Sequence, residues 1–276
     1  MKKPKFIILS PSENEPSGGM IVLHHLKRKL EDLNFDVKMQ HWQDDTKIIS
    51  DLDTTVVVYP EIINHNPTNA KHVVRWILNR PGVIGGNPST YGENDLIYLF
   101  NEYFGYNKPN NGILHLIDYK WDLWFEDDTE KDIECAHYIG KASKYYPHDG
   151  FNKHKEGSLD LTYMLHNYDE ASKILKRVKY FYSYDLMTFW SIAASMCGAT
   201  SIVIPKGKES YHYISKEDFY NYRPSCRYSV AYGEDEIERV NSEKHLLLNY
   251  LKEIEEKGNQ QVEKLIRDCT EKINKE

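Results

Sequence analysis

The chain has 276 residues, of which 40% are hydrophobic and 28% charged, a composition typical of a folded protein long enough for two domains. Its formal net charge is −7 and it has no dense basic block, so nucleic-acid binding is not expected, because phosphates require a stripe of Lys and Arg. No apolar run has the length of a membrane span or of a signal peptide, so we expect a cytoplasmic protein, with contact to a membrane surface left open.

The first part of the chain alternates short apolar runs with helical patterns. Strands are predicted over residues 5–10, 35–40, 54–60, 95–100 and 112–118. A helix opens at Gly18 and Gly19 and carries apolar residues at helical spacing through Leu33. A second helix is predicted over residues 68–79, ended by Pro81 and Gly82. This order predicts one doubly wound α/β half.

A second α/β series follows an acidic linker over residues 120–134. Strands are predicted over residues 135–140, 158–165, 179–184, 201–205 and 227–233. Helices are predicted over residues 169–177 and 186–197. The tail over residues 234–274 is predicted to form one or two amphipathic helices, with a break at Gly258.

The expected architecture is therefore α/β, with two Rossmann-like halves facing across a cleft and helices at the end of the chain. We expect an N-terminal Rossmann-like domain over residues 1–130 and a second one over 131–240. Helices over residues 241–276 are expected to pack back on the body.

The four cysteines, at 135, 197, 226 and 269, are scattered along the sequence. They form no Cys-x-x-Cys pair and show no Cys/His spacing typical of a metal site. We therefore expect reduced core residues and no bound metal.

Polar residues that directly follow strands are the candidate site residues, because open α/β sheets bind ligands outside the carboxyl ends of their strands. Ser17, Gly18 and Gly19 lie between the first strand and the first helix, where bare amides at a helix N-terminus favour an anion. A strand-to-helix turn equally requires glycine. The segment is not Gly-x-Gly-x-x-Gly, so a nicotinamide or flavin cofactor is not expected.

Glu61 and His65 follow the strand over residues 54–60, and both have general-base chemistry. Their loop is rich in Asn and Pro, and amides of such a loop also serve to cap a following helix.

In the second half, Gly140 clears space beside Lys141 and Lys144, which could reach a diphosphate or remain solvated. The strand over residues 179–184 carries Tyr182 and Tyr184 and is followed by Asp185, Thr188 and Ser191. A strand-end carboxylate accepts hydrogen bonds from sugar hydroxyls, and Thr188 could donate to phosphate oxygens. Alternatively, Asp185 caps the following helix.

Together these segments resemble glycosyltransferases of the GT-B fold, in which the second of two Rossmann-like halves holds most of the nucleotide sugar. In the retaining families typified by glycosyltransferase family 4, a strand is followed by Glu, seven residues, Glu, and Ala-Met-Ala-Cys-Gly before another strand. The stretch "DLMTFWSIAASMCGATSIVIP" lies on that pattern, with Asp185 on the first Glu and Ala193 on the second. The segments "VVYPEI", "VVRWILNRPG" and "VAYG" look closer still to a rhamnosyltransferase-like branch of bacterial enzymes.

The resemblance implies a metal-independent transferase of hexosyl or pentosyl groups. Its donor would be a nucleotide diphosphate sugar, and its acceptor a glycan of a surface polysaccharide or glycoprotein. The family's diphosphate-binding residues fall near Gly140-Lys141 and Lys144.

The chain also departs from the family pattern. Ala193 cannot hold ribose hydroxyls, so this contact is absent or moved to Ser191, Thr188 or Tyr182, and the first half is trimmed. The stereochemical outcome stays open, and so does the choice of Glu61 or His65 as base. Two alternatives remain: a nucleotide-sugar epimerase on the same fold, and a non-catalytic sugar- or nucleotide-binding subunit of a transferase complex.

Overall fold

The computed structural model describes residues 2–11, 18–42, 51–104, 106–145, 150–165, 167–207 and 213–275. The fold is α/β, as expected, with two parallel sheets in two compact units. Unit 1 contains residues 1–118 and 255–276, and unit 2 contains residues 119–254. Within the described ranges, no helix combines the length and the apolar character needed to cross a membrane.

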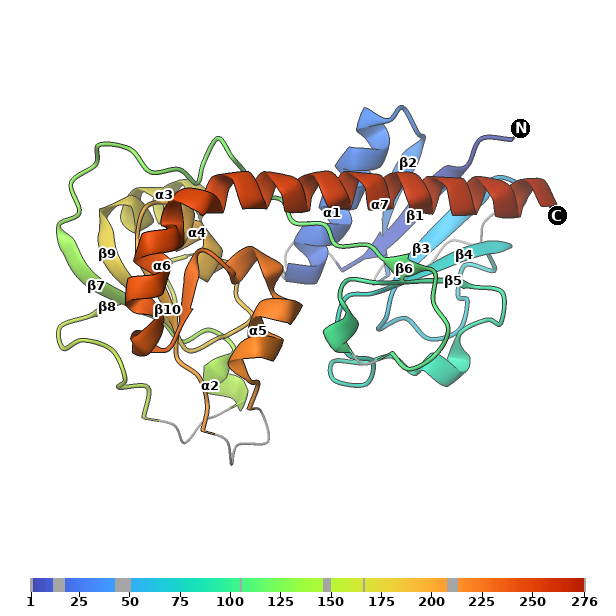
Figure 1. The fold of residues 1–276 in the computed structure, drawn as a ribbon. Coiled ribbons are helices and arrows are strands. Elements are labelled where there is room, and N and C mark those ends of the chain that lie inside the picture. Colours follow the sequence, from blue (N-terminus) through green and yellow to red (C-terminus); the bar gives the residue numbers. More distant parts are fainter. Residues whose placement is uncertain are drawn as a thin grey trace. The chain divides into compact units, whose positions relative to one another are not determined.

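Unit 1 contains a six-stranded parallel sheet with the strand order β2-β1-β3-β4-β5-β6 (Figure 1). Its strands are β1 (Lys5–Ser10), β2 (Val37–His41), β3 (Thr55–Pro60), β4 (His72–Ile77), β5 (Leu96–Leu99) and β6 (Gly112–Ile113). The first helix, α1 (Gly18–Asp32), connects β1 to β2 and begins at the predicted glycines. Short 3-10 turns occur at Pro88–Thr90 and Glu102–Phe104.

One face of this sheet is covered by α1 and by the last helix of the chain, α7 (Leu247–Lys275). Side chains alternate along each strand, so every second residue joins this core. The core contains Phe6, Ile8, Val56, Val58, Val74, Trp76 and Tyr98 from the sheet, Leu23, Leu26 and Leu30 from α1, and Val262, Leu265, Cys269 and Ile273 from α7. On the opposite face, the described residues from outside the strands that pack against Val57, Tyr59 and Ile77 come from loops and from the 3-10 turn at Glu102–Phe104.

The helix predicted over residues 68–79 is wrong, because this segment forms β4. All six residues of β4 are buried, and the strand pairs with β3 on one side and β5 on the other. A strand buried on both faces is a continuous apolar run without period-2 alternation, which periodicity cannot tell from a buried helix. The run is also shorter than an ordinary helix and rich in Val, Ile and Trp, which favour strands.

Unit 2 contains a five-stranded parallel sheet with the order β11-β10-β9-β7-β8. Its strands are β7 (Ile133–Tyr138), β8 (Leu159–Asp160), β9 (Val178–Ser183), β10 (Thr200–Val203) and β11 (Val230–Tyr232). Its helices are α2 (Ala142–Tyr145), α3 (Tyr168–Arg177), α4 (Trp190–Met196), α5 (Lys216–Tyr222) and α6 (Ile237–Glu243), with 3-10 turns at Pro224–Cys226, Glu234–Glu236 and Lys244–Leu246. All predicted strands of this half are present, although β8 is much shorter than the predicted 158–165.

The helices of unit 2 pack on its central strands. Helix α4 contacts β9 and β10, and α6 contacts β10 and β11. The four cysteines of the chain are buried and free of disulfide bonds, as expected.

The predicted helix break at Gly258 is wrong, because α7 continues through this residue. A methyl group at Gly258 would lie 2.8 Å from the carbonyl oxygen of His115 and 3.2 Å from Leu116 Cδ2. The glycine therefore permits close packing of the helix on the segment after β6.

The two units differ in their boundaries from the domains expected from sequence, 1–130, 131–240 and 241–276. Unit 1 ends at Asp118, before the acidic segment, and also includes residues 255–276.

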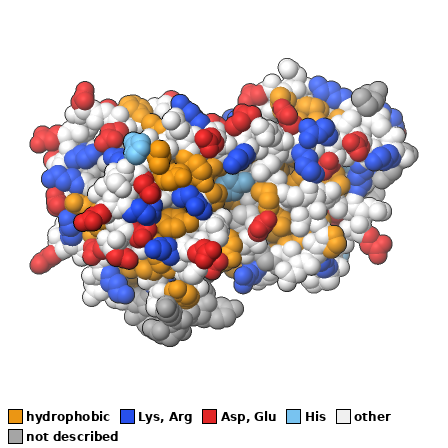
Figure 2. Space-filling model, in the orientation of Figure 1, with side chains coloured by type: hydrophobic (Ala, Val, Ile, Leu, Met, Phe, Trp, Pro, Cys, Tyr) orange, Lys and Arg blue, Asp and Glu red, His pale blue; other side chains and the backbone are white. Residues whose placement is uncertain are grey.

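Acidic and basic side chains are interspersed over the face of the molecule drawn in Figure 2.

Candidate functional site

Each sheet has one topological switch point, where consecutive connections leave in opposite directions. In unit 1, β2 lies on one side of β1 and β3 on the other. In unit 2, β8 lies on one side of β7 and β9 on the other. Ligands of open α/β sheets bind outside the carboxyl ends of the strands at such points. The segments after β1 and β3, and after β7 and β9, are therefore the candidate sites.

At the switch point of unit 2, the segments after β7 and β9 meet. The Lys141 amide donates to Asp185 Oδ2 at 3.4 Å. Gly140 has a φ of +53°, and a methyl group there would lie 2.3 Å from the Tyr138 ring. Burial, followed by the Asp185 carboxylate, raises the pKa of the Tyr138 hydroxyl. Four residues from two strand ends thus form one polar cluster, and three of them were predicted as site residues.

Asp185 is half-buried and does not cap α4. This helix begins at Trp190, later than the predicted residue 186, and its N-cap residue is Phe189. Asp185 Oδ1 instead accepts from the Met187 amide at 3.0 Å, in a turn local to the strand end. The Thr188 side chain is buried and its Oγ1 accepts from the Trp190 amide at 3.3 Å.

Three other predicted donor-site residues lie in the interior of unit 2. The Tyr182 hydroxyl donates to Glu234 Oε1 at 2.6 Å, and the Tyr184 hydroxyl lies 2.7 Å from His154 Nδ1. Ser191 is fully buried, and its Oγ has no hydrogen-bond partner among the described residues. Lys144 lies in α2, and its side chain falls outside the described part of the chain.

At the switch point of unit 1, Gly18 and Gly19 form the first turn of α1, after β1, as predicted. The predicted Ser17 lies outside the described residues. Glu61 directly follows β3, and His65 lies four residues further along the same loop. The ends of β1 and β3 are adjacent because these strands pair.

Glu61 is only 3% exposed and is enclosed by the segment after β4. Its Oε2 accepts from the Leu78 amide at 3.0 Å, and its carbonyl oxygen accepts from the Tyr91 hydroxyl at 2.6 Å. Gly86 packs so closely that a methyl group there would lie 2.0 Å from the same carbonyl oxygen. Burial raises the pKa of the Glu61 carboxyl to about 7, against the opposing effect of the Leu78 amide. A carboxyl with this pKa exchanges its proton near neutral pH.

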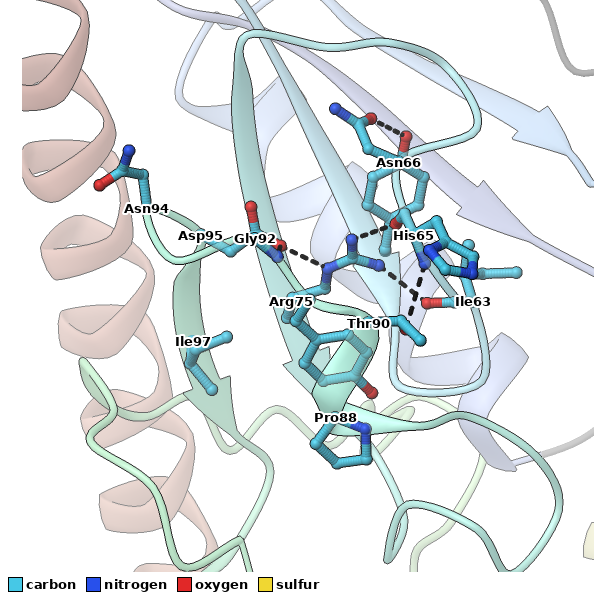
Figure 3. A network of polar contacts seen from close by, with 12 residues as sticks. Ile63, His65, Asn66, Arg75, Pro88, Thr90, Gly92, Asn94, Asp95 and Ile97 are labelled. Atoms are coloured by element: carbon cyan, nitrogen blue, oxygen red, sulfur yellow. Dashed lines mark hydrogen bonds and ion pairs between the residues drawn. The ribbon is translucent and has the colours of Figure 1, made fainter.

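Arg75 on β4 fixes the loop that carries His65. Its fully buried guanidinium donates to Asp95 Oδ2 at 2.8 Å, to the Ile63 carbonyl at 2.8 Å and to the His65 carbonyl. Figure 3 shows this guanidinium at the centre of the network, between the loop after β3 and the loop that leads to β5. The rings of Tyr59 and Tyr91 stack on it, with centroids 4.5 and 4.7 Å from Cζ.

His65 is exposed at a positive φ of +55°, and its amide donates to Thr90 Oγ1 at 3.2 Å. Its backbone is therefore held from two sides, while its ring faces solvent.

Sequence reasoning missed Tyr138, Arg75 and Glu234. Arg75 carried a signal, because a lone arginine inside the run "HVVRWI" requires several partners once the run is buried. Glu234 carried none, since only the fold places it beside Tyr182. Tyr138 stands two residues before Gly140, but its ring meets this glycine only through the positive φ of the turn.

Within the described ranges, no three His, Cys, Asp or Glu side chains gather in a group that could hold a metal ion. A scan of protein-family models and a search of curated proteins found no match to this chain.

Proposed function

We propose that this protein is a glycosyltransferase of the GT-B type, whose two halves face each other across a cleft. The donor, a nucleotide diphosphate sugar, binds at the switch point of unit 2, and the acceptor binds at that of unit 1. One observation carries the proposal: the backbone amide of Lys141 donates to the Asp185 carboxylate at the position where open α/β sheets bind nucleotides.

The residues at the unit 2 switch point have chemistry suited to the donor. The exposed Lys141 ammonium would neutralise part of the diphosphate charge. The half-buried Asp185 carboxylate would accept hydrogen bonds from sugar hydroxyls.

In the proposed transfer, an acceptor hydroxyl oxygen forms a bond to the anomeric carbon of the donor sugar. The bond from that carbon to the diphosphate oxygen breaks, and its electron pair leaves with the nucleoside diphosphate. If the configuration inverts, Glu61 takes the hydroxyl proton, with His65 as the alternative base. The pKa of Glu61, about 7, suits this role, and the loop enclosing it must yield to admit the acceptor.

No residue is assigned to bind the ribose hydroxyls of the donor nucleotide. Ala193, at the family's second Glu position, is fully buried, as are Tyr182 and Ser191. This observation favours the second candidate, a subunit that binds nucleotide or sugar without catalysis.

Binding and turnover separate the two candidates. The test adds nucleoside diphosphates and their sugars to the protein and records its melting temperature, then the release of nucleoside diphosphate with glycan acceptors. A ligand at 100 times its Kd should add about 2.7 kcal/mol of stability. Stabilisation with release supports a transferase, and stabilisation without release supports a binding subunit. Formation of an epimer in the absence of acceptor would show that the protein is an epimerase. If no ligand of the panel stabilises the protein, the transferase, the binding subunit and the epimerase are all refuted.

Lys141→Ala tests the diphosphate contact. It should weaken binding of a nucleoside diphosphate much more than binding of the corresponding nucleoside, measured by calorimetry. Lys173→Ala is the matched control, an exposed lysine on α3 in the same unit. Equal losses for both ligands would show that Lys141 does not contact phosphate.

Asp185→Asn tests the carboxylate while keeping an oxygen for the Met187 amide. Transfer should be lost while the fold is kept. Asp127→Asn is its control, because Asp127 accepts from the Thr129 amide in a similar turn away from the switch point. If the Asp185 variant has the wild-type kcat/KM, Asp185 is not part of the donor site.

A further inference from the structure

Two histidines of unit 2 stack face to face. His137 belongs to β7, and His154 belongs to segment 150–158, which precedes β8. Their ring centroids are 3.9 Å apart and the ring planes differ by 9°. Such a stack suits neutral imidazoles, because two imidazolium charges at this distance repel each other strongly.

Each ring is oriented by hydrogen bonds. His137 Nδ1 lies 3.0 Å from Ser158 Oγ, and Cys135 Sγ lies 3.2 Å from the same hydroxyl. His154 Nδ1 lies 2.7 Å from the Tyr184 hydroxyl, on the segment directly after β9. The stack therefore joins segment 150–158 to both β7 and the end of β9.

Two further side chains attach segment 150–158 to the sheet. The Phe151 ring packs edge-on against Tyr184, at 5.2 Å between centroids. Lys155 Nζ lies 3.6 Å from the Tyr180 ring centroid and 3.2 Å from Glu134 Oε1. Of these attachments, only the histidine stack changes its charge between pH 5 and 8.

Among the described residues, the carboxylate that acts on both rings is Asp160. Asp160 Oδ1 lies 3.8 Å from His137 Nε2 and favours protonation of both rings. Burial, and then the neighbouring His154, lower the pKa of His137 in spite of this carboxylate. Burial likewise lowers the pKa of His154. Lys155 and Glu134 neutralise each other at the edge of the segment, and burial raises the pKa of the Tyr184 hydroxyl to about 12, so this hydroxyl is uncharged at neutral pH.

We propose that the His137–His154 stack is a proton-operated latch, which holds segment 150–158 on the sheet at neutral pH and releases it when both rings become protonated. The first proton is tolerated because Asp160 compensates it. The second places like charges on adjacent rings, so the rings separate and the segment carrying His154 leaves the sheet. The latch does not depend on the reaction proposed above.

The direction of the pH effect follows from proton linkage. A released histidine has the ordinary pKa of about 6.5, whereas both rings in the closed segment have lowered values. The released state therefore binds more protons, so attachment is complete above pH 6.5 and is lost as the pH falls toward the lowered values. For each histidine, every pKa unit by which the closed value lies below the released one shifts the equilibrium about tenfold toward release at acidic pH.

Hydrogen exchange of the wild-type protein tests the latch without any variant. Protection factors, corrected for the intrinsic pH dependence of exchange, are compared at pH 7.5 and pH 5.0. Protection of segment 150–158 should fall at least about tenfold, while α3 in the same unit stays protected. Equal protection of the segment at both pH values would overturn the proposal.

His154→Phe keeps an aromatic ring for the stack but cannot take a proton. It should retain protection of the segment at pH 5.0 as at pH 7.5. His245→Phe is the matched control, because His245 is an exposed histidine of the same unit and the variant should show the wild-type loss. A full pH response in His154→Phe would assign the loss to another group and refute the latch.

Discussion

A charge buried in the middle of a strand requires partners for each of its donors, and Arg75 shows how loops can supply them. Its guanidinium has a carboxylate, two carbonyl oxygens and two aromatic faces as partners. Arginine suits this position because its planar fork donates in several directions and stacks on rings, which lysine does not do. The residue thereby ties together loops that cover a face of the sheet where the described residues provide no α-helix.

Arg75→Met should reduce the free energy of unfolding by about 3–5 kcal/mol, measured by urea denaturation. The loss arises because Asp95, whose side chain is 10% exposed, keeps a buried charge without its partner. Arg177→Met is the matched control, since Arg177 and Asp132 form a similar ion pair with both side chains 47% exposed. That exposed pair should contribute less than about 1 kcal/mol. Similar losses in both variants would mean that the Arg75 network is not a structural clamp.

Glu61 should make the protein less stable as the pH rises from 4.5 to 7.5. Burial raises the pKa of its carboxyl from the ordinary 4.5 to about 7 in the folded chain, so the folded state binds the extra proton between these values. Its stabilising effect is therefore complete below pH 4.5 and is lost as the pH rises through 7. Glu61→Gln removes this titration, so the stability difference between wild type and variant should change by about 2–3 kcal/mol across the range. A constant difference would show that the carboxyl titrates normally.

At the element scale, the sequence predicted strands better than the connections between them. Every predicted strand is present, because short apolar runs bounded by Gly, Pro or polar residues are distinctive. The segment 68–79 was misassigned because a fully buried strand and a buried helix share the same apolar run. The predicted break at Gly258 is wrong for another reason. A glycine either ends a helix or allows close packing inside one, and the contact with His115, which is distant in sequence, shows that packing applies here.

Gly258→Ala should destabilise the protein by about 1–3 kcal/mol in spite of the higher helix propensity of alanine. The added methyl group would lie 2.8 Å from a backbone carbonyl, which cannot move as a side-chain tip can. Asn259→Ala, the next residue of the same helix, gains propensity and should be neutral or slightly stabilising. Thermal unfolding of both variants measures the contrast, and a stabilised Gly258→Ala would refute the close-packing explanation.

At the scale of the whole molecule, the sequence allowed the prediction of two parallel α/β halves and of several residues at their strand ends. It did so because ligands of such sheets bind after the strands, and Gly18, Glu61, Gly140, Lys141 and Asp185 are placed there by chain order alone. Chain order does not reveal which of these side chains become buried. Glu61, Tyr182 and Ser191 are enclosed by residues distant in sequence, which no local pattern specifies.

The last helix has a consequence for how the chain is made. Apolar residues of α7 complete the core beside α1 and the first strands, although the whole of unit 2 separates them in sequence. During synthesis, which proceeds from the N-terminus, α1 alone covers this face of the unit 1 sheet until residues 255–275 emerge. Unit 2, continuous in sequence, is complete before then. Unit 1, whose strands are made first, is therefore completed last, and its partly covered face leaves apolar surface open to association with other chains during synthesis.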